Sequence, residues 1–247
     1  MRTFSGTDTG RRRDMNQDYM YISETPVGNL PNLFILADGM GGHNAGDYAS
    51  RYTVEVIVNA VRNSSEHSPA VVIRRAIAEA NQAVMEKART DIDLEGMGTT
   101  VVVATVQDRE LCVANVGDSR LYVLGADMEQ ITKDHSYVQE MVRRGEISPE
   151  VARIHPDRNI ITRAVGGGRE VEVDFFEVEL KDGDRILMCS DGLTDMLEDE
   201  EIFEIVNENQ DIGAAMQELI DTANEYGGND NITVILTEPF SGEVKIC

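Results

Sequence analysis

Residues 32–43 read Asn-Leu-Phe-Ile-Leu-Ala-Asp-Gly-Met-Gly-Gly-His, an apolar run followed by an aspartate and a cluster of glycines. The apolar run predicts a buried strand, which would carry the carboxylate of Asp38 to the rim of a sheet. The glycines let the backbone approach a metal ion or a phosphate closely; a tight turn without a ligand is the alternative for this stretch alone. The same junction recurs at Asp191-Gly192, after the apolar residues 185–190. Two such junctions in one chain favour a site over a coincidence.

Three further aspartates lie in turn-like contexts: Asp18 in Asn-Gln-Asp, Asp118 in Gly-Asp-Ser-Arg and Asp230 in Asn-Asp-Asn-Ile-Thr. Carboxylates that lie close together repel one another, and a bound cation makes such a cluster tolerable. Oxygen ligands without paired histidines or cysteines suit hard ions such as Mg²⁺ and Mn²⁺. The five aspartates therefore predict a multinuclear magnesium or manganese site that is assembled from distant segments.

The apolar pattern predicts blocks of strands and helices rather than strict alternation. Strands are expected at residues 2–8, 19–24, 32–37, 99–106, 111–116, 121–124, 171–179, 185–190 and 231–237, and helices at about 45–63, 68–89, 199–207 and 211–226. Consecutive strands with short turns indicate antiparallel pairing, and two packed sheets with helices on their outer faces would bury them. Residues 133–168 lack continuous apolar periodicity, which is typical of a functional flap. We therefore expect an α+β fold, with one domain over residues 1–240 and a short tail at 241–247.

The composition restricts the partners of the chain. With 247 residues and a net charge of −23, it is a poor match for nucleic acid or an anionic membrane surface. Cys112, Cys189 and Cys247 do not make a disulfide framework, which favours a reducing compartment. No uncharged apolar stretch approaches the roughly 18–20 residues that a membrane-spanning helix needs. We expect a cytoplasmic monomer that binds neither nucleic acid nor membrane.

Arg13 lies five residues before Asp18, and two interpretations of it are open. A guanidinium beside clustered carboxylates can be their salt-bridge partner. It can also clamp a phosphate dianion through two parallel hydrogen bonds. The second interpretation predicts a phosphorylated substrate.

Six short motifs occur along the chain in a fixed order: Arg13-x-x-Asn-Gln-Asp18, Asp38-Gly-Met-Gly-Gly-His43, Gly98-Thr-Thr100, Gly117-Asp-Ser-Arg120, Ser190-Asp-Gly192 and Asp230-Asn-Ile-Thr233. Each motif is weak alone, but the ordered set, which runs from about residue 2 to residue 238, is highly specific. Through it the chain resembles the metal-dependent type-2C (PPM) Ser/Thr protein phosphatases. It is most similar to the compact bacterial form that partners Hanks-type Ser/Thr kinases.

The resemblance implies an α-β-β-α sandwich with metal ions in a cleft at one end of the two sheets. It implies that Asp38 bridges two Mn²⁺ or Mg²⁺ ions and that the carbonyl group of Gly39 joins one coordination sphere. Asp191 and Asp230 would ligate the other ion. Asp18 would contribute directly or through water.

The resemblance also implies a third, looser ion held by Asp118 with Asp191, and it makes Arg13 the residue that holds the substrate phosphate. A hydroxide that bridges the metal ions would hydrolyse phosphoserine and phosphothreonine in proteins, including a cognate Ser/Thr kinase. Eukaryotic relatives have a histidine at the position of Met40. The proton donor to the leaving alcohol is therefore open between His43 and water.

Two other functions fit the sequence less well. A phosphatase dedicated to anti-sigma antagonists would commonly carry a sensory domain, for which these 247 residues have no room. A catalytically silent metal-binding scaffold would not need five aspartates together with Arg13. Within the flap, two interpretations of His135, Ser136 and His155 are open: they touch the substrate or the third-metal region, or they only order the loop.

Overall fold

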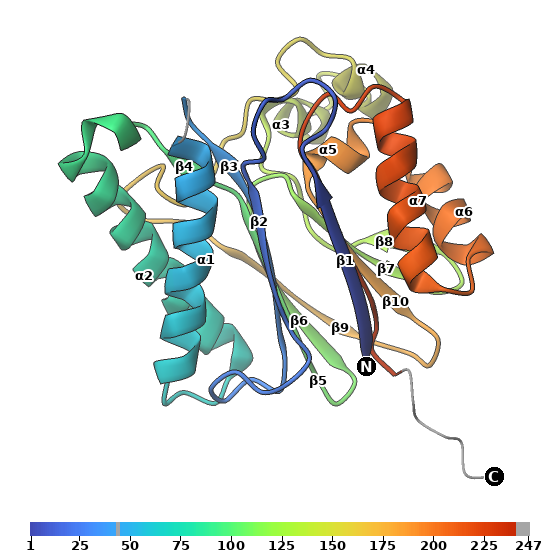
Figure 1. Cartoon of the computed structure of the whole chain (residues 1–247), viewed down its shortest axis with the longest axis horizontal. Coiled ribbons are helices and arrows are strands. Elements are labelled where there is room, and N and C mark those ends of the chain that lie inside the picture. Colours follow the sequence, from blue (N-terminus) through green and yellow to red (C-terminus); the bar gives the residue numbers. More distant parts are fainter. Residues whose placement is uncertain (43–44, 241–247) are drawn as a thin grey trace.

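The computed structural model describes residues 1–42 and 45–240, and its strands form two antiparallel sheets that pack face to face (Figure 1). The first sheet has the strand order β1 (Arg2–Asp8), β11 (Ile232–Glu238), β10 (Arg185–Cys189), β7 (Arg120–Leu124) and β8 (Met128–Gln130). The second has the order β2 (Asp18–Ser23), β3 (Leu33–Met40), β5 (Val101–Gln107), β6 (Glu110–Val116) and β9 (Asp174–Glu179), with β4 (Gly98–Thr99) paired to β3. The expectations for His43, Cys247 and the tail at 241–247 lie outside the described residues.

Helices cover the outer face of each sheet, as Figure 1 shows. The long helices α1 (Ala45–Asn63) and α2 (Pro69–Thr90) pack on the second sheet, and α6 (Asp199–Glu208) and α7 (Ile212–Glu225) pack on the first. Shorter helical segments are η1 (Ile92–Leu94), α3 (Tyr137–Arg143), α4 (Pro149–Arg153) and α5 (Asp191–Thr194). The predicted α+β sandwich is confirmed. In the part of the chain that the structure describes, no helix is long and apolar enough to cross a membrane.

Strand β3 illustrates how the layers are held together. Ile35 packs in the core between the second sheet and helices α1 and α2, whereas the next residue, Leu36, packs in the core between the two sheets. Successive side chains of a strand point to opposite faces, so a strand covered on both faces needs an unbroken apolar run. Residues 33–37, which are all buried, supply that run. The apolar run at residues 33–37 therefore lies in β3, a central strand of the sandwich.

Some elements near the predicted site differ from the sequence expectation. Strand β3 continues to Met40, beyond its expected end at residue 37, because its last two residues pair with β4. The glycine-rich turn therefore starts later than predicted. Asp191, expected directly after a strand, is the first residue of α5, with Ser190 in the N-cap position. The strand expected at 171–179 begins only at Asp174.

Candidate metal centre

Asp18 and Asp38 lie directly opposite each other on the neighbouring strands β2 and β3. Like charges in this arrangement destabilise a sheet. Asp18 is 6% exposed, and its Oδ2 accepts hydrogen bonds from Ser190 Oγ at 2.7 Å and Thr233 Oγ1 at 2.6 Å. Its Oδ1 has no hydrogen-bond partner. Burial raises the pKa of Asp18 to about 7, so this pair of carboxylates is costly to ionise without a cation.

Asp191 and Asp230 come from the first sheet, at the same end of the sandwich. Asp191 follows β10, and Asp230 lies just before β11. The Oδ1 atom of Asp191 also has no hydrogen-bond partner. Gly192 lets α5 pack closely, because a Cβ atom at this position would lie 2.0 Å from the carbonyl oxygen of Asn231. The Asp-Gly pair thus brings the two acidic turns of the first sheet together.

Asp118 follows β6 in a turn that packs against Thr100, the residue between β4 and β5. Gly117 has a φ of +108°, and a Cβ atom there would lie 2.5 Å from the side chain of Thr100. The hydroxyl group of Thr100 accepts a hydrogen bond from the Asp38 amide at 3.0 Å and lies 2.8 Å from Ser119 Oγ. One threonine therefore joins the turn that carries Asp118 to the strand that carries Asp38.

A cleft of about 210 Å³ collects most of the predicted site residues. Its lining includes Arg13, Asp38, Gly39, Asp118, Asp191 and Asp230. Asp18 does not line the cleft, and it reaches the site as the cross-strand neighbour of Asp38. The structure therefore brings together acidic side chains from both sheets.

The electrostatics of this cleft fit divalent cations. Burial and neighbouring carboxylates raise the pKa values of Asp38 and Asp191 well above the ordinary value, and burial raises the pKa of Asp118 to about 7. Among the described residues, no three His, Cys, Asp or Glu side chains lie close enough together to hold a metal ion by themselves. Mg²⁺ needs no such group, because it is commonly bound through one or two carboxylates and keeps several waters. The donor set thus fits hard ions whose coordination water completes the shell.

Arg13 forms a salt bridge in the structure. Its Nη2 donates to Asp230 Oδ2 at 2.6 Å, while Asp230 Oδ1 accepts a hydrogen bond from the Asn231 amide at 2.8 Å. A phosphate contact would require the guanidinium group to leave or share Asp230. The two interpretations of Arg13 therefore describe alternative partners of one exposed side chain.

Asn231 braces the loop that carries Arg13. Its Oδ1 accepts a hydrogen bond from the Gln17 amide at 2.8 Å, and its Nδ2 lies 2.9 Å from both the Thr9 and Met15 carbonyl oxygens. These contacts engage both ends of the side-chain amide. They support a bracing role for Asn231 rather than metal ligation.

Sequence reasoning missed the hydroxyl groups that hold the carboxylates. Ser190 and Thr233 bind Asp18, and Thr100 binds the backbone of Asp38. The signal was present, because these hydroxyl residues belong to the Ser-Asp-Gly, Asp-Asn-Ile-Thr and Gly-Thr-Thr motifs. Their partners could not be assigned without the fold.

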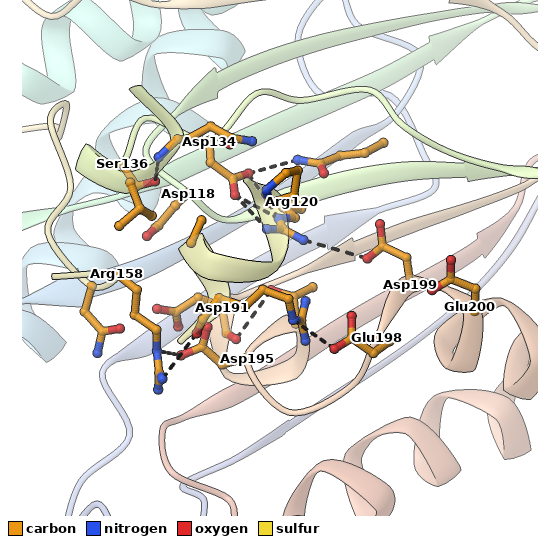
Figure 2. Close-up of a pocket in the computed structure, with 18 residues that line it drawn as sticks. Asp118, Arg120, Asp134, Ser136, Arg158, Asp191, Asp195, Glu198, Asp199 and Glu200 are labelled. Carbon is orange, nitrogen blue, oxygen red and sulfur yellow. Dashed lines mark hydrogen bonds and ion pairs between the residues drawn. The ribbon is translucent and has the colours of Figure 1, made fainter. Parts of the chain in front are cut away.

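A second cavity, of about 320 Å³, opens between the flap and helices α5 and α6 and shares Asp118 and Asp191 with the cleft (Figure 2). The flap contacts the opposite wall through an ion pair of Arg153 with Glu198 at 2.9 Å. A further pair joins Arg158 to Asp195, a carboxylate in this cavity that sequence analysis did not single out, at 3.4 Å. The segment predicted as a flap therefore lies beside the cleft.

Two of the flap residues considered above make contacts that order the loop. Ser136 Oγ accepts a hydrogen bond from the Gln139 amide at 3.3 Å and so caps α3. His155 Nδ1 accepts a hydrogen bond from the Asp157 amide at 3.1 Å. The loop-ordering interpretation accounts for both residues.

The chelated protein is expected to be less stable at about pH 8 than at about pH 5.5. The pKa of Asp18 and of Asp118 is about 7 in the folded protein against an ordinary 3.8, so the folded state binds more protons than the unfolded chain between these values. This contribution to the free energy of unfolding is complete below about pH 4 and is lost as the pH rises through about 7. The loss is on the order of a few kcal/mol. Urea unfolding in EDTA at both pH values measures the difference.

Saturating Mn²⁺ provides the control for this prediction. Divalent ions bind the ionised carboxylates, so the decline toward pH 8 should disappear in their presence. Equal stability of the chelated protein at both pH values would contradict the raised pKa values.

Comparisons with known proteins show extensive similarity. A model of the family "Protein phosphatase 2C" matches residues 5–237. The serine/threonine phosphatase stp of Listeria innocua is 43% identical over 237 residues, which cover 94% of this chain and 93% of that protein. The crystal structure of the serine/threonine phosphatase PstP/Ppp of Mycobacterium tuberculosis matches with a TM-score of 0.86 and 36% identity, covering 95% of this chain and 97% of that one. The catalytic domain of PstP in complex with two manganese ions matches with a TM-score of 0.83 and 35% identity, covering 95% and 96%.

Proposed function

Because this chain belongs to the protein phosphatase 2C family and is a metal-dependent protein Ser/Thr phosphatase, we propose which of its residues carry out that reaction. The resemblance stated from the motifs is thereby confirmed at the level of family, fold and enzyme class. The roles of individual residues are part of this proposal. The observation that carries them is the convergence of acidic side chains from two sheets, two of which keep a buried oxygen without a hydrogen-bond partner.

We propose that residues lining the cleft bind the two core metal ions. Asp38 would bridge two Mn²⁺ or Mg²⁺ ions, with the Gly39 carbonyl group on one of them and Asp191 and Asp230 on the other. Asp18 would act on the same two ions directly or through water, because it is the cross-strand neighbour of Asp38 and its Oδ1 has no hydrogen-bond partner. When bound, such ions supply an activated water for attack on phosphorus and positive charge for the phosphoryl oxygens.

Arg13 is proposed to hold the substrate phosphate. Its planar guanidinium group can donate two parallel hydrogen bonds to phosphoryl oxygens once it turns from Asp230. The side chain is about half exposed, so this movement needs no change in the core. Arg13 would orient the phosphate in both the ground state and the transition state.

The proton for the leaving alcohol is proposed to come from water. Met40 lines the cleft and has no proton to donate, and no histidine is among the described residues that line it. Asp118 with Asp191 would hold a third, looser cation at the junction of the two cavities and so order water on the leaving-group side. This assignment makes Asp118 important for poor leaving groups.

Asp118→Ala is therefore expected to slow hydrolysis of phosphoserine peptides at least about tenfold more than hydrolysis of p-nitrophenyl phosphate. An aryl leaving group has a low pKa and hardly needs a proton, whereas a serine alkoxide does. Steady-state kinetics on both substrates at saturating Mn²⁺ measures the two losses. Glu200→Ala, which changes another acidic residue of the second cavity, is the control. Equal proportional losses on both substrates would reject the role in proton supply.

We further propose that residues 1–240 act as one catalytic domain, monomeric and cytoplasmic, on phosphoproteins that include a cognate Ser/Thr kinase. The supporting observation is the similarity over nearly the full length to bacterial serine/threonine phosphatases. Deleting the gene should raise phosphoserine and phosphothreonine occupancy on that kinase and its substrates. Quantitative phosphoproteomics measures this, with deletion of the kinase as the matched control. An unchanged phosphoproteome would contradict the proposed partner.

A further inference from the structure

His135 lies beneath the turn that presents Asp118, in the segment between β8 and α3. It is 7% exposed, so its imidazole cannot reach a substrate in solution. It binds both polar backbone groups of Gly117: the Gly117 amide donates to His135 Nδ1 at 3.0 Å, and the His135 amide donates to the Gly117 carbonyl oxygen at 3.0 Å. The two peptide groups that flank Gly117 are therefore held by one residue, and the second of them leads into Asp118.

The hydrogen bond from Gly117 determines the tautomer of the imidazole. Nδ1 is the acceptor, so in the neutral ring the proton is on Nε2 and can be donated to Asp174 Oδ2 at 3.2 Å. Arg163 Nη1 also lies 3.2 Å from Nε2. Arg163 Nη1 donates to the other oxygen of this carboxylate at 2.9 Å. Burial lowers the pKa of His135, which preserves the neutral ring that can accept from Gly117.

The backbone around His135 is tied down as well. Its carbonyl oxygen accepts a hydrogen bond from the Thr162 amide at 2.7 Å, on the returning segment of the flap. Asn115 Nδ2, from the end of β6, donates to the Lys133 carbonyl oxygen at 2.9 Å. Because these hydrogen bonds fix the backbone around His135, the imidazole can hold the Gly117 turn in place.

From this geometry we propose that His135 is a positioning residue that holds the Gly117–Asp118 peptide so that the Asp118 carboxylate stays directed at the cavity it shares with Asp191. The proposal rests on the proposed function, because it takes Asp118 to be a cation ligand. Gly117 packs against Thr100, which leaves the turn little room to relax. Loss of the hydrogen bond to Nδ1 should therefore change the position of the Asp118 carboxylate.

Two near-isosteric substitutions separate the two sides of the imidazole. In His135→Asn, the amide oxygen replaces Nδ1 and can still accept the Gly117 hydrogen bond, but the Asp174 contact is lost. In His135→Gln, the longer side chain reaches the Nε2 position and Asp174, but the acceptor for Gly117 is lost. Both variants remove a ring from a buried site, so both should unfold at a lower temperature.

The experiment is Mn²⁺ titration of the substrate-free, full-length protein by calorimetry, with each binding isotherm compared with that of wild type. His135→Gln is expected to weaken the lowest-affinity site about ten- to a hundredfold, the usual cost of losing a residue that orients a metal ligand. His135→Asn should stay near the wild-type affinity. Asp118→Ala should abolish that site, and adding His135→Gln to it should change the remaining isotherm no further.

The outcomes distinguish the two proposals. If Asp118→Ala removes the weak site but His135→Gln and His135→Asn both leave it intact, His135 only stabilises the fold and the positioning role is overturned. Equal weakening by Asn and Gln would also overturn it, because the Gly117 contact would not be the cause. If Asp118→Ala leaves the wild-type isotherm unchanged, the third cation site is wrong, and the His135 proposal fails with it.

Discussion

Exhaustive removal of divalent cations is expected to abolish turnover, and added Mn²⁺ or Mg²⁺ is expected to restore it. A bound divalent ion lowers the pKa of the attacking water by several units, so the chelated protein should lose at least about a thousandfold in rate. The cysteines of the described core cannot replace the activated water as the nucleophile. Cys112 and Cys189 are buried, and burial raises their thiol pKa values to about 11 and about 12, far from the reactive thiolate form.

Initial rates on p-nitrophenyl phosphate and on a phosphothreonine peptide, before and after chelation, measure this effect. Zn²⁺ and Ca²⁺ should restore little activity, because Zn²⁺ prefers nitrogen and sulfur ligands and Ca²⁺ prefers more oxygen ligands at longer distances. Far-UV circular dichroism of the chelated protein controls for unfolding. Full turnover after chelation, with the fold intact, would rule out the metal-dependent reaction at this cleft.

Asp38→Asn is expected to reduce kcat by at least about a hundredfold, even at saturating Mn²⁺. Changes to residues that only orient a metal ligand cost ten- to a hundredfold, so replacing the proposed bridging carboxylate should cost no less. The loss should not come from misfolding. In the chelated state the neutral amide faces Asp18 without charge repulsion, so thermal unfolding at about pH 8 should occur at a temperature equal to or above that of wild type.

Arg13→Ala is the matched contrast for the Asp38 variant. It removes a charge from the same cleft but no proposed metal ligand. It should raise KM for a small phosphomonoester with a smaller loss in kcat, since the phosphate charge is present in both the ground state and the transition state. Near-normal rates for Asp38→Asn at saturating Mn²⁺ would refute the bridging role, and an unchanged KM for Arg13→Ala would refute the phosphate clamp.

Much of the architecture could be predicted because it depends on short-range patterns. The apolar run at 33–37 predicted a buried strand, since a strand covered on both faces must be apolar at every position. Short turns between strands predicted antiparallel sheets, and the order of the acidic motifs predicted the family. The acidic motifs lie at or near strand ends, where a charged side chain can reach the edge of a buried sheet at lower cost than in its middle.

The partners of the site residues, in contrast, depend on contacts between distant parts of the chain. Arg13 binds Asp230, which is 217 positions away, and Asp18 is held by Ser190 and Thr233, 172 and 215 positions away. No local pattern encodes these pairs, because they arise only when two sheets pack and bring separate strand ends together. The same holds for His135, whose sequence neighbours gave no sign of Gly117 as its partner.

The sequence alone therefore determined which residues are able to bind metal and phosphate, through their chemical type and their place at the ends of apolar strands. The tertiary structure decided that one oxygen each of Asp18 and Asp191 stays without a hydrogen-bond partner and that Arg13 pairs with Asp230. It also decided that the buried imidazole of His135 contacts the turn that carries Asp118. The physical reason is that chemical type and local periodicity are properties of short segments. Burial, repulsion between carboxylates and hydrogen-bond partnership exist only after the two sheets have closed on each other.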